Sequence, residues 1–280
     1  MNHRSVRRLL GAVLLPILPL VAGAGLSRPL HAQSDPPVVE AAPVPYGPGE
    51  KAVYQVKLGV ITVGHGSMSV LGVEYVQGHP TYHARLEAKG GIPLARVDDR
   101  FESWIDVHGL FSRRFRQDQK EVHYERHRRF DFFPESLSFR QVDNGKTGTL
   151  PTNRPLDDVS FLYYVRTLPL RVGDTYTIPR YFQESGNPVV LKVLRKETVT
   201  VPAGTFNTVV VQPVIRSSGL FGEGGRAEVY FTDDSRRLMV QMSSRVPVVG
   251  SLNLYLESYE PGEALTTVPA PALAGGEAAQ

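Results

Sequence analysis

The stretch "TVTVPAGTFNTVVVQP", from Thr198 to Pro213, holds two runs rich in β-branched residues that are separated by Pro202, Ala203 and Gly204. β-branched residues favour strands, and a Pro-Ala-Gly break between two such runs is a turn signal. Pro202 fixes φ for the first central position of a type I turn, and Gly204 can adopt the positive φ of a G1-type bulge. The stretch therefore predicts a β-hairpin and not a catalytic or phosphate-binding loop.

The same alternation of apolar and polar residues extends over most of the chain. It is clearest in "KAVYQVKLGV" (51–60), "TYHARLEAK" (81–89) and "GSLNLYLESY" (250–259). A period of two is typical of half-buried strands. Turn signals separate the strands, and Asn144-Gly145 predicts a two-residue primed turn with positive φ at both positions. We therefore expect an all-β, mainly antiparallel fold, with a single curved sheet or half-open β-barrel of roughly a dozen strands.

One segment departs from this pattern. In "PLDDVSFLYYVRTLP" (155–169), Asp157 and Asp158 can accept hydrogen bonds from the free amides of a first helical turn, and the segment ends before a proline. An apolar stripe at helical spacing follows, formed by Phe161, Val165 and Leu168. The sequence predicts one short helix near residues 157–168, which plugs an open end of the sheet or covers one of its faces.

The N-terminus has the layout of a secretory signal peptide. Three arginines precede an apolar run of about 18 residues from Leu9 to Leu26, and small residues surround Ala32. An uncleaved anchor is the alternative, although the run is at the lower limit for a membrane-spanning helix and contains two prolines. We expect a signal peptide at 1–32 cleaved near Ala32, a Pro-rich linker at 33–48, a β domain at 49–261 and a disordered tail at 262–280. The mature protein would then be periplasmic or secreted.

Composition excludes several classes of function. The chain has no cysteine, and therefore no disulfide, thiol nucleophile or cysteine metal site. Its net charge of +3 falls to −1 when the four arginines of residues 1–32 are removed, so nucleic acid is not an expected partner. Neither a G-x-S-x-G motif nor a Walker loop occurs. We expect no enzyme activity and no cofactor.

Two groups of polar residues are candidates for a metal-binding or catalytic site. In "KEVHYERHRRFDF" (120–132), His123, Glu125, His127 and Arg129 share one face of a strand. Two histidines four residues apart on a strand are about 13 Å apart, too far to share one metal ion without a bulge. The sequence favours a solvated face, with Tyr124, Phe130 and Phe132 toward the core. The aspartate pairs 157–158 and 233–234 fit a helix cap and a turn better than a paired-carboxylate hydrolase.

A concentration of basic residues lies in the same region of the chain. Its members are Arg113, Arg114, Arg116, Lys120, Arg126, Arg128 and Arg129, and acidic residues interrupt it. Such a patch can meet anionic lipid or polysaccharide in the cell envelope. Ordinary ion pairing between neighbouring strands is the alternative, and the sequence favours it.

The order of four segments is similar to that of a known family. These segments are "GPGEKAVYQVKLGVITVGHGSM", "DDVSFLYYVRTLPLRVGDTYTIP", "KETVTVPAGTFNTVVVQP" and "EVYFTDDSRRLMVQMSSRVPVVGSLNLYL". Together they resemble the domain of unknown function 3108 family of exported bacterial proteins, over about residues 46–259. The resemblance implies an envelope protein with a curved antiparallel sheet, and it brings no established activity or catalytic residues.

These observations lead to one main hypothesis and two alternatives. The main one is a non-enzymatic protein that holds a lipid or another hydrophobic or amphipathic small molecule in the concave face of a β half-barrel. The expected lining residues are Tyr54, Val56, Leu58, Phe101, Trp104 and Leu254. The alternatives are a structural or interaction module with an envelope protein partner, and an outer-membrane β-barrel. For the first two, membrane association would be at most peripheral.

Overall fold

The computed structural model describes residues 38–92, 95–121, 124–214, 227–246 and 250–269. All of them belong to one compact unit, residues 36–280. The expected signal peptide at 1–32, the first part of the linker and the last part of the tail lie outside the described residues. His123 and the connection formed by residues 215–226 lie outside them as well.

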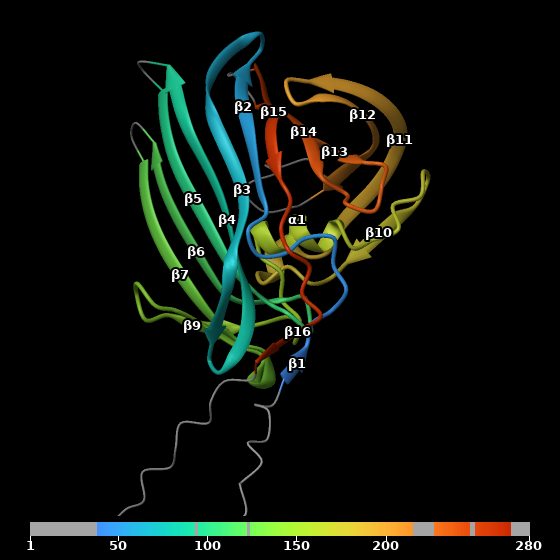
Figure 1. Cartoon of the computed structure of the whole chain (residues 1–280). Helices are drawn as coiled ribbons and strands as arrows, with labels where there is room; N and C mark the ends of the chain where they lie inside the picture. The colour runs from blue at the N-terminus through green and yellow to red at the C-terminus, as the bar shows by residue number, and fades with distance from the viewer. Residues whose placement is uncertain (1–37, 93–94, 122–123, 215–226, 247–249, 270–280) are drawn as a thin grey trace, which may run out of the picture. The chain divides into compact units, whose positions relative to one another are not determined.

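Fourteen strands form one curved sheet in the order β10-β11-β12-β13-β14-β15-β2-β3-β4-β5-β6-β7-β8-β9, with every neighbouring pair antiparallel (Figure 1). The edge strands β9 and β10 are not paired with each other, so the sheet is open. This confirms the predicted all-β half-barrel. The strands are β2 (Lys51–Leu58), β3 (Ile61–Val76), β4 (His79–Ile92), β5 (Ala95–Asp106), β6 (Ser112–Glu121), β7 (Tyr124–Phe133), β8 (Ser138–Gln141), β9 (Thr147–Thr149), β10 (Thr175–Ile178), β11 (Val189–Val201), β12 (Gly204–Val214), β13 (Ala227–Thr232), β14 (Met239–Val246) and β15 (Gly250–Glu260).

The hairpin predicted from the opening stretch is present as β11 and β12. Val199 pairs with Phe206, and Gly204 has a φ of +132°, which an L side chain would strain. The expected G1 bulge is wrong, because pairing continues without a shift to Val201 and Gly204. The register shift of this pair lies instead between Val193 and Arg195. The turn thus contains two residues, and the extra twist of a bulge is introduced farther down the strand.

Two other details of the predicted turns and strands differ from the structure. Between β8 and β9 only Gly145 has a positive φ, +72°, and the Gln141 amide donates to the Lys146 carbonyl oxygen, so the turn is not a two-residue primed turn. Val60, predicted on the apolar face of its strand, is 92% exposed because β2 ends at Leu58 and the residue lies in the hairpin tip. The predicted core positions of that strand, Ala52 and Tyr54, are buried.

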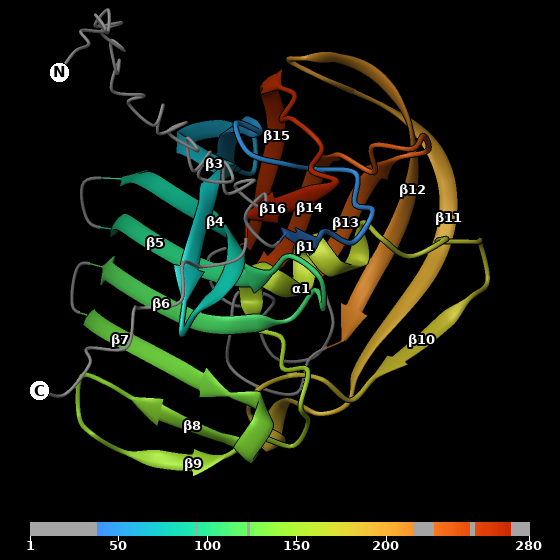
Figure 2. The same ribbon diagram turned by 60° about the horizontal axis from the view of Figure 1, so that its bottom comes forward.

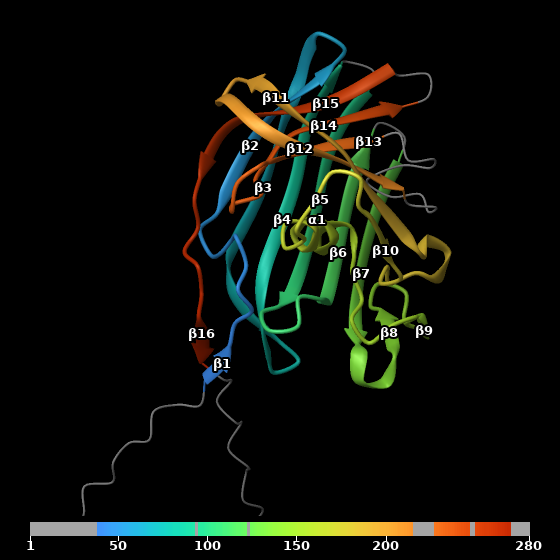
Figure 3. The same ribbon diagram turned by 90° about the vertical axis from the view of Figure 1, so that its right-hand side faces the viewer.

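The helix α1 (Asp158–Val165) lies on the concave side of the sheet, and the strands curve around it (Figures 2 and 3). Seven of its eight residues are buried. The predicted apolar stripe of Phe161, Val165 and Leu168 therefore underestimates how much of the helix is buried, because Tyr164 is its one residue that is not buried. Two short 3-10 turns, η1 (Pro134–Ser136) and η2 (Glu184–Gly186), complete the helical elements of the described residues.

The expected linker and tail contribute to the folded unit. Residues from each form a two-stranded sheet, β1 (Val38–Glu40) and β16 (Thr267–Pro269), and Val268 is buried. The Ala42 amide donates to the Val107 carbonyl oxygen. The expected domain boundaries at 49 and 261 therefore exclude residues that the structure places against the domain.

Candidate ligand-binding site

The concave face of the sheet is the face that meets α1. Ser103 of β5 donates a hydrogen bond of 2.7 Å to Asp157, the residue before the helix. Because side chains alternate along a strand, Asp99 and Phe101 share this face with Ser103. Residues that pair directly across neighbouring strands lie on the same face. The strand pairings therefore identify the concave residues of all the other strands.

Rows of paired residues that cross this face change from polar to apolar between β7 and β2. One row runs through Arg128, Gln117, Phe101, Leu86, Met68 and Ala52. The next row toward the strand tips runs through Arg126, Gln119, Asp99, Ala88, Gly66 and Tyr54. In these two rows the concave face is thus polar or cationic on β6 and β7, and apolar or small on β2, β3 and β4.

The structure brings most of the predicted lining residues to one surface. Val56 pairs with Leu254, and a Cβ atom added at Gly66 would lie 3.8 Å from both side chains. Leu58 and Leu254 are half-buried, whereas Phe101 is buried. Tyr54 is also buried, and its hydroxyl donates to the Met239 carbonyl oxygen at 3.0 Å.

Trp104 lies apart from this group. It is three residues from Phe101 on the same strand and therefore points to the outer face. There its Nε1 donates to Glu74 at 2.7 Å, and its ring stacks on His83 with 4.4 Å between the centroids. The prediction that Trp104 lines the concave face with Phe101 is wrong for this geometric reason.

The N-terminal end of α1 is capped by a buried carboxyl group. Asp157 accepts hydrogen bonds of 2.8 Å from the Val159 and Ser160 amides, and the Asp157 amide donates one of 2.8 Å to the Ser160 hydroxyl oxygen, which completes a capping box. Burial raises the pKa of Asp157, although its hydrogen bonds act in the opposite direction. Asp157 thus has the capping role predicted from the sequence.

Asp158, the first residue of the helix, borders a small hollow of about 110 Å³. The Tyr181 hydroxyl donates to Asp158 at 3.1 Å, and an isolated parallel bridge between Leu156 and Tyr181 holds that tyrosine beside the helix. Burial, and then the charge of Asp157, raise the pKa of Asp158 to about 7. The other lining side chains are Phe115, Phe130 and Phe182, and the polar Gln117, Arg126, Arg128 and Gln183.

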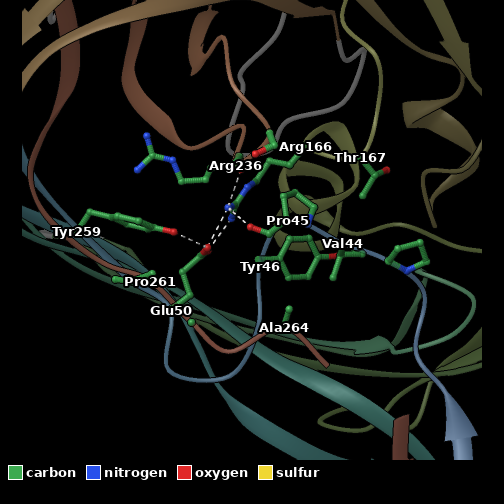
Figure 4. A pocket seen from close by; sticks show the side chains of 13 residues that line it. Val44, Pro45, Tyr46, Glu50, Arg166, Thr167, Arg236, Tyr259, Pro261 and Ala264 are labelled. Atoms are coloured by element: carbon green, nitrogen blue, oxygen red, sulfur yellow. Dashed lines mark hydrogen bonds and ion pairs between the residues drawn. The ribbon is translucent and has the colours of Figure 1, made fainter. Parts of the chain in front are cut away.

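The C-terminal end of α1 borders a larger hollow of about 560 Å³, and Figure 4 shows the side chains around it. Arg166 forms a two-point ion pair with Glu50, with nitrogen to oxygen distances of 2.6 and 2.9 Å. Arg166 also donates to the carbonyl oxygens of Pro45 and Arg236, and Tyr259 donates to Glu50 at 3.2 Å. The charges at this end are therefore matched by protein groups.

The environment of Arg166 also includes aromatic rings. Its guanidinium carbon lies 5.2 Å from the ring centroid of Tyr46 and 5.5 Å from that of Tyr163, within the range of cation–π contacts. Burial acts to lower the pKa of Arg166, but the hydrogen bonds and charge of Glu50 outweigh it and raise that pKa. The Nε atom of Arg166 and the hydroxyl of Tyr46 are buried without a hydrogen-bond partner among the described residues.

The basic concentration divides between the two faces of the sheet. Arg113 and Arg114 bind Asp106 and Asp131 at 2.6 Å, and Arg116 binds Asp118 at 2.7 Å. The pairs of Arg113 and Arg114 join neighbouring strands, as the favoured prediction has it, whereas the pair of Arg116 with Asp118 lies within β6. Arg126 and Arg128, in contrast, share the concave face with Phe130. A single cationic surface formed by all seven residues is therefore not present.

The other candidate groups have ordinary structural roles. His127 lies between Asp118 and Glu125 at 2.9 and 3.2 Å, and the hydrogen bond to Asp118, followed by that to Glu125, raises the pKa of His127. Within the described ranges, no group of three or more His, Cys, Asp or Glu residues is arranged to hold a metal ion. Asp233 binds Lys196 at 2.6 Å, and Asp234 accepts from the Arg236 amide in the turn after β13.

Sequence reasoning missed two features of this site. Arg126 and Arg128 belong to the basic concentration by their charge. Their alternation with Phe130 is the signal that places them on the core-facing side of the strand. Glu50 and Arg166 are 116 residues apart, and no local pattern connects them. The first feature could have been found from the sequence, and the second required the fold.

An open antiparallel sheet that curves around a capped helix, with a concave face of mixed polarity, defines a β half-barrel protein. The sequence matches the model of the family described as "Protein of unknown function (DUF3108)" over residues 53–257, and the chain belongs to this family. This confirms the resemblance drawn from the four segments. No curated protein sequence matches the chain.

Several solved structures are similar in part. A beta-barrel-like protein of domain of unknown function DUF1849 from Brucella abortus has a TM-score of 0.49 and 12% identity, with 79% of this chain and 100% of that chain covered. A candidate lipoprotein from Parabacteroides distasonis has a TM-score of 0.34 and 11% identity, covering 78% and 99%. A candidate exported protein with a YmcC-like fold from Bacteroides fragilis has a TM-score of 0.29 and 11% identity, covering 79% and 99%.

In the part of the chain that the structure describes, no helix has the length and apolar character needed to cross a membrane.

Proposed function

We propose that this chain is an exported, non-catalytic envelope protein that holds an amphipathic ligand on the concave face of its half-barrel. The observation that carries the proposal is the change along one cross-strand row, from Arg128 and Gln117 to Phe101 and Leu86. A concave face that only filled a core would be apolar throughout, because charged residues are rarely buried without a partner. A face that is polar at one side and apolar at the other matches a molecule with the same division.

The accessible part of this face lies toward the tips of the strands. Leu86 and Met68 are buried and form its floor, whereas Leu58, Leu254 and Val97 are half-buried. Direct pairs connect Val97 through Gly90 and Gly64 to Val56 and Leu254. The two glycines place no side chain between these apolar groups, which supports binding of an apolar chain there.

Export is part of the proposal and is supported by the N-terminal sequence of charged, apolar and small residues. A non-catalytic role is also part of the proposal. It is supported by the sequence, which contains no nucleophile motif and no phosphate-binding loop.

The direct test is native mass spectrometry of the protein purified from its own envelope, followed by titration with an apolar fluorophore. We expect a bound mass that organic solvent extracts, and saturable binding of the fluorophore. Leu254→Gln on the concave face is expected to weaken that binding about tenfold, because it places a polar amide against the apolar part of the ligand. Tyr255→Gln, the next residue and on the outer face, serves as the matched control and is expected to leave it unchanged.

The outcome that overturns the proposal is protein with no bound mass and no fluorophore binding. Co-purification of that empty protein with one envelope protein in a fixed ratio would support the alternative, a structural or interaction module.

A further inference from the structure

The small hollow beside the start of α1 is enclosed by groups that mostly donate hydrogen bonds. Two guanidinium groups, Arg126 and Arg128, and two carboxamides, Gln117 and Gln183, face one carboxyl group, that of Asp158. Gln117 already donates to Gln119 at 2.7 Å. A hollow with this excess of positive charge and donors is suited to an acceptor that carries negative charge.

Arg128 is the residue that best defines this hollow. Among the described residues, its side chain makes no hydrogen bond and no ion pair within 4 Å, and its charge contributes only a minor lowering of the pKa of Asp143. The neighbouring Arg129, on the outer face, lies 3.9 Å from Asp131, and Arg114 binds the same aspartate at 2.6 Å. Arg128 thus differs from its neighbours in facing a hollow without a protein carboxylate as its partner.

Asp158 does not fill the role of that partner. Among the residues that the structure describes, no ion pair within 4 Å connects it to Arg128, and its carboxyl group accepts a hydrogen bond from the Tyr181 hydroxyl. Because burial raises the pKa of Asp158 to about 7, much of this carboxyl group is uncharged at neutral pH. An uncharged Asp158 does not supply a negative charge for Arg128.

We propose that this hollow binds the anionic group of an amphipathic ligand, a carboxylate or a phosphate, through Arg128 with Gln117 and Arg126 beside it. The proposal rests on the proposed function and names the class of ligand. The hollow of about 110 Å³ has room for a head group but is well below the 300–1,000 Å³ of a site that encloses a whole small-molecule ligand. The apolar part then extends toward β2, five strand spacings from Arg128 on β7, or about 24 Å at about 4.8 Å per strand.

The test compares an acid with its uncharged ester. The delipidated full-length mature protein is titrated at neutral pH with a fluorescent long-chain fatty acid and with the methyl ester of the same acid. Because a hydrogen-bonded charge contributes more than a neutral contact, we expect the acid to bind at least about tenfold more tightly than the ester. Arg128→Gln is expected to remove this preference while the affinity for the ester stays within about twofold.

Two further variants keep the test decisive. Arg129→Gln, adjacent in sequence but on the outer face, is the matched control and should keep the full preference for the acid. Arg128→Lys keeps the charge and loses the paired donors of the guanidinium, so it should retain part of the preference. Circular dichroism of each variant, compared with the unsubstituted protein, confirms that the sheet is intact.

A third titration, with inorganic phosphate, distinguishes the source of the anion. Equal affinities for acid and ester in the unsubstituted protein would overturn the head-group site and leave the proposed function standing. Binding of phosphate that Arg128→Gln abolishes, with no binding of acid or ester, would support an anion site for a free anion and overturn the proposed function. Failure of all three ligands to bind would overturn both.

Discussion

The two ends of α1 bury charge in different ways. At the C-terminal end, Arg166 and Glu50 meet at 2.6 and 2.9 Å, and Tyr259 adds a hydrogen bond to the carboxylate. At the N-terminal end, Asp158 accepts from Tyr181, and Arg128 faces the same hollow without a carboxylate partner. Both ends are close to a hollow, and the larger hollow lies at the end where the charges are matched.

This difference separates a structural role from a binding role. A buried ion pair whose partners are both present has already replaced the water lost on folding, so an incoming ligand would have to displace a protein group. A half-buried guanidinium group without a carboxylate partner, such as that of Arg128, gains when an external anion supplies the negative charge. The size of a hollow is therefore a poorer guide to function here than the balance of charge around it.

The largest expected effect concerns the matched end. Glu50→Gln removes the negative charge and leaves Arg166 buried and unpaired, which costs about 3 to 5 kcal/mol in the free energy of unfolding. Urea denaturation followed by circular dichroism measures it.

The double variant Glu50→Gln with Arg166→Met is the control, because it removes both charges. We expect it to recover much of the loss, since an apolar side chain of similar length can replace a buried ion pair with little net change. A loss below about 1 kcal/mol in the single variant would contradict the interpretation that this end is held by the ion pair.

The second effect concerns Asp158, where the substitution is expected to raise the free energy of unfolding and not to lower it. The pKa of Asp158 is raised in the folded protein to about 7 from an ordinary value of 3.8, so its neutral form is favoured on folding. The stability that this contributes is complete below the unfolded pKa and is lost as pH rises through the folded pKa. Asp158→Asn has no such loss, and its advantage over the unsubstituted protein should grow by about 2 to 3 kcal/mol from pH 5 to pH 8.

Asp233→Asn provides a control at a half-buried carboxylate that is held in ion pairs. Hydrogen bonds from Lys196, and then from Arg237, lower the pKa of Asp233, so it is ionised at both pH values. Its substitution should change stability equally at pH 5 and at pH 8. An advantage of Asp158→Asn that did not depend on pH would show that the carboxyl group is ionised throughout, and the contrast between the two ends of the helix would be lost.

The sequence predicts the elements of this fold better than it predicts the site. Alternation in "KAVYQVKLGV" and the turn at Gly204 depend on local backbone preferences, and both elements are present. Trp104 is predicted on the concave face with Phe101, but the period of two puts residues three apart on opposite faces, and Trp104 stacks on His83 at the outer face. The pairing of Glu50 with Arg166 follows from how the helix lies across the sheet, which no local pattern encodes.

A smaller effect is expected at the N-terminal cap of α1. Asp157→Ala removes the acceptor for the Val159 and Ser160 amides, and loss of an N-cap of this kind costs about 2 kcal/mol. Asp157→Asn keeps an acceptor at the same place and should retain most of the stability. Thermal denaturation of both variants measures the difference. Equal stability of the two would mean that the carboxyl group of Asp157 does not act as a cap.

The smallest effect is the pH dependence of anion binding at the unmatched end. The groups that face the hollow and can carry charge are Asp158, Tyr181, Arg126 and Arg128, with Asp157 next to Asp158 in the chain. Both arginines stay charged at neutral pH, so deprotonation of Asp158 is the change that adds a negative charge beside the bound anion.

A fluorescent alkyl sulfonate, whose own charge is constant, should therefore bind more tightly below the pKa of Asp158 than above it, by about threefold between pH 6 and pH 8. Asp158→Asn should bind it with the same affinity at both pH values, because the group that repels the anion no longer titrates. Arg128→Gln should weaken binding at both values and leave a dependence on pH in place. Tighter binding by the unsubstituted protein at pH 8 than at pH 6 would place the anion away from Asp158, and with it away from this end of the helix.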